Sequence, residues 1–258
     1  MKKILTVLFA LISLTAIQTK TEAAAIDRTI SSSGINKSAV SVSVKDVKTG
    51  KTVYKLNEKQ PNMPASTLKI ITLSASLDTL GEDYEFKTQL YKNTNNELIL
   101  KLGADPFLRS SEIKELIASA TEKKILSPKA IYIDDYVLDS TEWGEGWQWD
   151  DDLNPLMPKF SSYNLDGNLL KIIIAPTSQG SPANIYTAKF YPTTFMNLVT
   201  TGDKSDITIS RNNSISPDLL TVEGTVKGQI SKQIPINHPK RYFILRLEDA
   251  IPVSYTHL

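Results

Sequence analysis

The first recognisable pattern is an alternation of apolar and polar positions over residues 39–56, AVSVSVKDVKTGKTVYKL. It continues on both sides of DVKTGK, which is typical of two strands joined by a turn. After a polar, proline-containing loop, residues 66–81, STLKIITLSASLDTLG, space their apolar side chains as one buried helical face would, with Gly81 as the helix stop. The predicted buried positions are Leu68, Ile71, Leu73, Ala75, Leu77 and Leu80. We therefore predict a hairpin followed by a helix.

The rest of the chain mixes strand and helix patterns without a regular βαβ period. Strands are expected within 84–93, 97–108 and 130–135, and a helix from about 111 to 124. Residues 140–164 hold all three tryptophans with prolines and acids, and they read as a long ordered loop. Four later segments suggest further short strands and a final helix: 168–176, 206–212, 219–230 and 241–250. The pattern predicts an α+β fold.

The N-terminus has the features of a secretion signal. A basic MKK precedes the apolar residues 4–17, and Ala23–Ala25 offer small residues to signal peptidase. We expect cleavage after Ala25 and export to the periplasm or to the extracellular face of a bacterial envelope. An uncleaved membrane anchor is the alternative, which Lys20 and Glu22 disfavour because they interrupt the apolar run.

Composition removes several function classes. Without residues 1–25 the chain has 26 basic and 27 acidic residues, so its net charge of −1 does not favour nucleic acid. No cysteine is present, which excludes disulfides and lipidation through cysteine. With only two histidines, His238 and His257, and no cysteine, a metal site would have to be built almost wholly from carboxylates, and we expect none.

Candidate chemistry begins with Ser66 and Lys69 in PASTLK. Residues three apart at a helix start share one face, so the lysine amine can reach the serine hydroxyl. A serine needs a base to take its proton, and a lysine can serve once burial or nearby positive charge lowers its pKa. The apolar neighbours of Lys69 are compatible with such burial. The plain alternative is a serine helix cap beside a solvated lysine, and the second S-x-x-K of the chain, SEIK at 111–114, reads better in that way.

The order of elements resembles the penicillin-recognising serine enzymes, and most closely the D-alanyl-D-alanine carboxypeptidase/endopeptidase family, the class C low-molecular-mass penicillin-binding proteins. The resemblance rests on DVKTG, PASTLK, LKLGADPFL, IYIDDYVLDSTEWGEGWQWDD, FSSYNLDGNLLKI and residues 222–250. It implies a β-lactamase/transpeptidase-like catalytic domain, here its N-terminal part, with a large, mainly β insertion between the first and second catalytic motifs. The implied division is a signal peptide at 1–25, catalytic domain at 26–84, insertion at 85–240 and return at 241–252.

Such enzymes also need S-x-N and K-[ST]-G clusters. Ser162 and Asn164 match the first by letter, but in the resembled family this place is a strand entry within the insertion. Residues 48–50, KTG, match the second, but they precede the serine and lie in the predicted hairpin turn, where Gly50 answers a need for positive φ. We interpret both as chance matches and expect the true motifs beyond the chain end.

The last six residues, VSYTHL at 253–258, match the translation of a common sequencing adapter. We expect them to be non-native and the chain to be a fragment that is poorly soluble or inactive alone, because a sheet without its partners exposes an edge and apolar faces. Sequencing the locus beyond Ile251 tests this expectation.

The resemblance implies a serine-type enzyme acting on peptidoglycan stem peptides through an acyl-enzyme on Ser66, with Lys69 as the base and no cofactor. β-Lactam antibiotics would acylate the same serine, and peripheral membrane association stays open. Two alternatives remain: a serine β-lactamase, which the long insertion disfavours, and a non-catalytic peptidoglycan-binding or scaffold protein.

Overall fold

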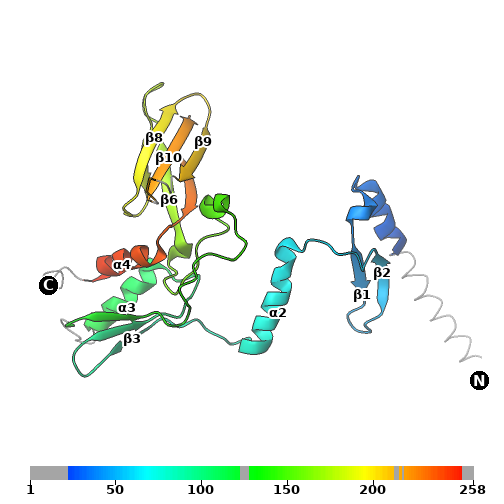
Figure 1. Ribbon diagram of the computed structural model, residues 1–258, viewed down its shortest axis with the longest axis horizontal. Helices are drawn as coiled ribbons and strands as arrows, with labels where there is room; N and C mark the ends of the chain where they lie inside the picture. Colours follow the sequence, from blue (N-terminus) through cyan, green and yellow to red (C-terminus); the bar gives the residue numbers. More distant parts are fainter. Residues whose placement is uncertain (1–22, 123–127, 212–214, 217, 252–258) are drawn as a thin grey trace, which may run out of the picture. The chain divides into compact units, whose positions relative to one another are not determined.

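The computed structural model describes residues 23–122, 128–211, 215–216 and 218–251 (Figure 1). Residues 1–22 of the predicted signal peptide and the predicted tail at 253–258 lie outside this part. The chain divides into two compact units, 1–84 and 85–258, and each is described by itself below.

The first unit contains the predicted hairpin. Strands β1 (Val42–Lys45) and β2 (Thr52–Leu56) are antiparallel, with Val44 opposite Tyr54. In the turn, the backbone N–H of Thr49 donates to Asp46 Oδ1 at 2.7 Å and Gly50 takes φ 69°. The Tyr54 hydroxyl donates to Asp27 Oδ1 at 2.7 Å, which ties the hairpin to a helix over residues 23–32. The hairpin prediction is confirmed.

The predicted helix is also present in the first unit. A 3₁₀ turn, η2 (Ala65–Thr67), leads into α2 (Leu68–Leu80), and Gly81 ends the helix with φ 83°. That backbone angle is open to glycine at little cost, which explains why the helix stops there.

The second unit is mainly β. Its described strands form three sheets, with the orders β3-β4-β5, β11-β6-β7 and β8-β10-β9. The bounds are β3 Gln89–Lys92, β4 Leu98–Lys101, β5 Ile131–Asp134, β6 Leu169–Ala175, β7 Asn184–Thr187, β8 Thr194–Thr201, β9 Asp206–Arg211, β10 Leu219–Val226 and β11 Ile230–Pro235. Neighbours pair antiparallel except for β4 with β5 and β8 with β10, which are parallel.

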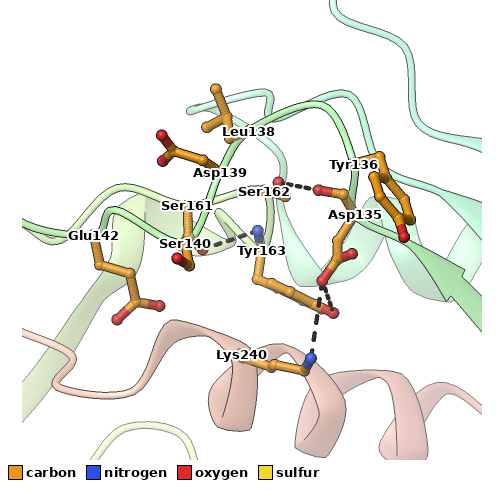
Figure 2. Close-up of a pocket in the computed structure, with 10 residues that line it drawn as sticks. All are labelled: Asp135, Tyr136, Leu138, Asp139, Ser140, Glu142, Ser161, Ser162, Tyr163 and Lys240. Carbon is orange, nitrogen blue, oxygen red and sulfur yellow. Dashed lines mark hydrogen bonds and ion pairs between the residues drawn. The ribbon is translucent and has the colours of Figure 1, made fainter.

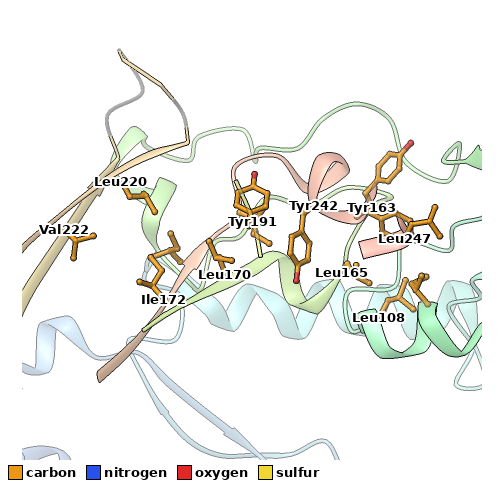
Figure 3. Close-up of a cluster of buried hydrophobic side chains, with 14 of the residues drawn as sticks. Leu108, Tyr163, Leu165, Leu170, Ile172, Tyr191, Leu220, Val222, Tyr242 and Leu247 are labelled. Carbon is orange, nitrogen blue, oxygen red and sulfur yellow. The ribbon is translucent and has the colours of Figure 1, made fainter. Parts of the chain in front are cut away.

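Two helices complete this unit: α3 (Ser110–Glu122) and α4 (Pro239–Ala250), which pack against each other. One hydrophobic core joins them to the sheets (Figure 3). Leu100, Ile172, Val222 and Phe243 in this core are fully inaccessible to solvent. Because apolar burial is the main favourable term in folding, this core is what holds the unit together.

Asp166 links three parts of the second unit. Its carboxylate accepts hydrogen bonds from the Tyr242 hydroxyl of α4 and from Lys189 Nζ, both at 2.7 Å. It also accepts from the backbone N–H of Ser110 at 3.1 Å, at the first residue of α3. Burial alone would raise the pKa of Asp166, but the Lys189, Tyr242 and Ser110 hydrogen bonds outweigh it, so this pKa lies below its ordinary value.

The tryptophan-containing segment is largely loop, as predicted, with one short 3₁₀ turn, η3 (Trp149–Leu153). Trp143 and Trp147 meet edge to face, with centroids 4.9 Å apart. Arg211 of β9 forms an ion pair with Asp152 at 2.7 Å, and both side chains are largely buried. The loop is therefore anchored to the β8-β10-β9 sheet.

Most predicted elements of this unit are confirmed, including the last helix. Strands β7, β8 and β11 were not predicted, since the last predicted strand segment ends at residue 230, where β11 begins. In β8 the polar Asn197 interrupts the apolar alternation, and its side chain instead bonds to backbone, donating to Ala183 O at 2.7 Å and accepting from Val199 N–H at 3.0 Å. The α+β class is confirmed by the mixture of helices and sheets.

Candidate active site

The predicted nucleophile and base lie together at the start of α2. Ser66 belongs to the 3₁₀ turn and Lys69 to the first turn of the helix, so both project from one face. Lys69 Nζ lies 3.1 Å from Ser66 Oγ, within hydrogen-bonding distance. The spacing therefore produces the contact that proton transfer between these groups requires.

The backbone just before the serine is unusual. Ala65 has φ 44°, in the left-handed region that residues with a Cβ seldom adopt. The Thr67 side chain hydrogen-bonds back to Pro64 O and holds this tight turn. Strained backbone persists where the surroundings fix it, and such positions cluster at functional sites.

The expectation of a buried helical face around Lys69 is wrong for this structure. Leu68, Ile71, Leu73, Leu77 and Leu80 are each between 51 and 68% exposed, and α2 has no buried residue. Within the first unit, no described residue covers this apolar face of α2. Lys69 is exposed as well.

Ser162 and Asn164 lie in the second unit, and their polar groups are engaged there. Ser162 Oγ donates to Asp135 O at 2.7 Å. Asn164 Oδ1 accepts from the Ser161 N–H at 3.0 Å and from Asn168 Nδ2 at 2.9 Å, and Asn164 Nδ2 donates to Ala104 O at 3.2 Å. Both residues are at least nine-tenths buried. These hydrogen bonds tie the segment before β6 to its neighbours.

The KTG at 48–50 forms the hairpin turn. Asp46 Oδ1 accepts from both the hydroxyl and the backbone N–H of Thr49, each at 2.7 Å. These bonds, the side-chain bond first, hold the pKa of Asp46 below its usual value. The KTG sequence at 48–50 therefore forms a hairpin turn.

A polar pocket of about 380 Å³ opens in the second unit (Figure 2). The carboxylates of Asp135, Asp139 and Glu142 line it together with Tyr163 and Lys240. Tyr163 OH donates to Asp135 Oδ2 at 2.6 Å, and Lys240 Nζ lies 5.0 Å from the Tyr163 ring centroid. Figure 2 shows Lys240 below the Tyr163 side chain. Such a lining suits a ligand with amino or hydroxyl groups.

Burial and the Asp135 hydrogen bond raise the pKa of Tyr163, while Lys240 opposes them. Sequence reasoning missed this pocket, because Asp135, Tyr163 and Lys240 come from three distant segments. The paired aspartates at 134–135, at the end of a predicted strand, were the one available signal.

The comparisons with known proteins fit these observations. The model of the D-Ala-D-Ala carboxypeptidase 3 (S13) family matches residues 22–250, so the match runs across both units. The chain belongs to this family. The resemblance stated from the sequence is thereby confirmed.

Individual relatives are distant. The chain is 22% identical over 174 residues to a D-alanyl-D-alanine carboxypeptidase of Actinomadura sp. (strain R39), covering 62% of this chain and 32% of that protein. The crystal structure of penicillin binding protein 4 (dacB) from Haemophilus influenzae is similar with a TM-score of 0.66 at 20% identity, covering 81% of this chain and 49% of that one. The same protein complexed with a novel β-lactam gives 0.58 at 17% identity, with coverages of 81% and 48%.

The solved structures show that the fold is that of a penicillin-binding protein. The chain spans about a third of the curated relative's length and about half of the solved chains. Within the described residues, no helix combines the length and apolar character needed to cross a membrane.

Proposed function

We propose that the full-length protein is a serine-type D-alanyl-D-alanine carboxypeptidase/endopeptidase that acts on peptidoglycan stem peptides. The observation that carries the proposal is the 3.1 Å contact between Lys69 Nζ and Ser66 Oγ, directly after the strained Ala65. Membership of the S13 family, whose model describes a D-Ala-D-Ala carboxypeptidase, supports the proposed substrate class.

In the proposed reaction, Ser66 Oγ attacks the carbonyl carbon between the two D-alanines while Lys69 accepts the hydroxyl proton. The amide C–N bond then breaks, and the proton passes to the departing amine. Water hydrolyses the resulting ester and returns Ser66 to its free form. Lysine serves as the base in its neutral form, so the active state requires surroundings that disfavour the ammonium.

We further propose that β-lactams acylate Ser66 by the same attack, with the ring amide replacing the peptide bond. The similar penicillin binding protein 4 from Haemophilus influenzae forms a complex with a novel β-lactam, which supports the proposal. Export to the envelope, suggested by residues 1–25, would place the enzyme beside its polymeric substrate.

The test is labelling by a fluorescent penicillin, measured on the full-length product of the natural locus. We expect the wild type to be labelled and Ser66→Ala to lose the label. Ser111→Ala is the matched control, because it removes the serine of the other S-x-x-K and should label normally.

Equal labelling of wild type and Ser66→Ala would reject the assignment of Ser66. Rapid turnover of a chromogenic cephalosporin would instead indicate a β-lactamase. Retention on insoluble peptidoglycan without labelling or hydrolysis would indicate a non-catalytic binding protein.

A further inference from the structure

A second pocket of the second unit carries an excess of positive charge. It has a volume of about 340 Å³ and lies where the start of α3 meets the end of α4. Ser111 and Lys114, the serine and lysine of SEIK, both line it from α3. Lys189 comes from the segment after β7, and Arg246 and Asp249 come from α4. The second S-x-x-K of the chain thus contributes to a pocket of its own.

Some of the cationic groups are already held in place by the protein. Lys189 Nζ contacts Asp166 Oδ2 at 2.7 Å and Ser110 Oγ at 2.5 Å. One terminal nitrogen of Arg246 donates to Phe190 O at 2.7 Å and lies 3.1 Å from Asp249 Oδ2. These contacts fix two positive charges at the pocket wall without filling it.

Three other donors have no partner within the described part of the chain. The Ser111 hydroxyl and the Lys114 ammonium form no hydrogen bond or ion pair there, and Arg246 Nε is buried without an acceptor. The Arg246 side chain is only 8% exposed, so water does not readily compensate this nitrogen. An unsatisfied buried donor of a charged group is costly, which indicates a site that an acceptor would complete.

The charge of the lining selects the ligand. Lys114, Lys189 and Arg246 all line the pocket, with Asp249 as the one carboxylate among the lining residues. Lys189 is already paired with Asp166, and Asp249 is 66% exposed. The lining residues thus offer a planar guanidinium, two ammonium groups and a hydroxyl from two helices and one loop. Donors of this kind can bind several oxygens of one tetrahedral anion. The N-terminal end of α3 adds a favourable dipole.

We propose that this pocket binds a phosphate group carried by a larger molecule. The cavity exceeds the size of a free phosphate ion, so the ligand is a phosphate ester whose remaining part occupies the open side. The phosphate would replace Asp249 as the partner of Arg246. The proposal does not depend on Ser66 or on acylation, since none of the lining residues belongs to the first unit.

The experiment is isothermal titration of the full chain with sn-glycerol 3-phosphate at low salt. We expect Lys114→Gln to weaken binding about 2–5-fold, as the loss of an exposed charge predicts. Ser111→Ala should weaken it about 3-fold through the loss of one hydrogen bond. Asp249→Asn should tighten it about 3-fold, because it removes the competing carboxylate.

Lys101→Gln is the matched control, since Lys101 is an exposed lysine of β4 outside the pocket, and it should bind like the wild type. Equal affinity of wild type, Lys114→Gln and Asp249→Asn would overturn the proposal. Acetate binding as tightly as the phosphate ester would also overturn it, because the site would then recognise any anion.

A second experiment distinguishes a phosphate of a membrane lipid from a phosphate of a soluble molecule. Sedimentation with phosphatidylglycerol vesicles, against phosphatidylcholine vesicles, tests a lipid headgroup. If the Lys114-dependent binding appears with vesicles and soluble ester alike, the pocket takes membrane phosphodiesters. If it appears with the soluble ester alone, the ligand is a soluble or polymeric phosphate ester. Absence of Lys114-dependent binding in both arms refutes the site.

Discussion

The two S-x-x-K sequences of this chain begin two helices with opposite character. In α2, Lys69 contacts Ser66 at 3.1 Å, the preceding Ala65 is strained, and the apolar face is exposed. In α3, Ser111 and Lys114 form no contact with each other and line a pocket instead. The same spacing thus gives a serine–lysine pair in one helix and two separate pocket-lining groups in the other.

The helix starts explain part of this difference. The first residue of α3 is held by Asp166, and Glu112 accepts from the Arg109 N–H at 2.8 Å just before it. At the start of α2 no side chain caps the 3₁₀ turn, and a positive φ sets the direction in which Ser66 enters the helix. A capped start stabilises structure, whereas a strained start positions one side chain.

The largest expected difference is chemical. In the full-length product of the natural locus, Lys69→Ala should slow acylation by a fluorescent penicillin about 10²–10⁴-fold, the usual contribution of a general base. Lys114→Ala should leave the rate unchanged, because that lysine lines the other pocket. Rapid-quench labelling measures both rates. An equal loss of acylation rate in Lys69→Ala and Lys114→Ala would contradict the assignment of different roles to the two lysines.

Packing gives the next largest difference. Ile113 of α3 is 1% exposed and Ile71 of α2 is 68% exposed. In this chain Ile113→Ala should lower the free energy of unfolding by about 2–5 kcal/mol, as for other large-to-small changes in a core. Ile71→Ala should change it by less than about 0.5 kcal/mol, as at other exposed positions.

Urea unfolding followed by tryptophan fluorescence measures Ile113→Ala, since Trp143, Trp147 and Trp149 all lie in the second unit. Circular dichroism, which also detects the helices of the first unit, measures Ile71→Ala. A substantial cost for Ile71→Ala would show that α2 is covered in solution. The two helices would then differ in the chemistry of their serine and lysine but not in their packing.

The positions of both helices were predicted from the sequence better than the packing around them. The hairpin, Gly81 and most strands followed from local periodicity and turn chemistry, and so did the pairing of Ser66 with Lys69. The exposure of α2 did not, because burial depends on what packs against a helix rather than on its own spacing. Strand β8 was missed because the polar Asn197 interrupts its apolar alternation. The Asn197 side chain hydrogen-bonds to backbone groups of Ala183 and Val199, and local periodicity does not predict such bonds.

Neither pocket could be read from the sequence either. Asp135, Tyr163 and Lys240 converge from three segments, as do Lys114, Lys189 and Arg246. Only the tertiary fold brings such charges together, whereas S-x-x-K is visible because one helical turn brings its two groups together.

Acid should affect the start of α3 through Asp166. The folded state lowers the pKa of this carboxyl from 3.8, so the stability it contributes is fully present above that value. This contribution is lost as pH falls through the lower pKa of the folded state. Asp166→Asn tolerates the positive φ of this position and should cost about 1–3 kcal/mol near neutral pH, because it removes a hydrogen-bonded charge.

The cost of Asp166→Asn should shrink when unfolding is measured at progressively lower pH. Asp206→Asn is the control, since Asp206 is exposed and its carboxylate forms no hydrogen bond or ion pair with the described residues. It should leave the acid profile near that of the wild type. A pH-independent cost for Asp166→Asn would show that hydrogen-bond geometry rather than charge matters there.

The smallest expected effect concerns Glu112, the acidic residue in the first turn of α3. Its carboxylate accepts from the Arg109 N–H and pairs with the Arg109 guanidinium at 3.0 Å. The Arg109 side chain, followed by the backbone bond, lowers the pKa of Glu112, so its contribution is present above its unfolded pKa and fades as pH falls through the folded value. Because the Glu112 side chain is 40% exposed, Glu112→Gln should cost only about 0.5 kcal/mol.

The first turn of α2 holds no acidic residue, so Thr67→Glu supplies the reverse test. If capping alone distinguishes the two helix starts, this change should raise the helicity of α2, seen by circular dichroism, without changing the acylation of Ser66. If acylation falls instead, the uncapped and strained start is itself part of what positions the serine. The difference between the two S-x-x-K sequences would then lie in the backbone before the motif as much as in the motif.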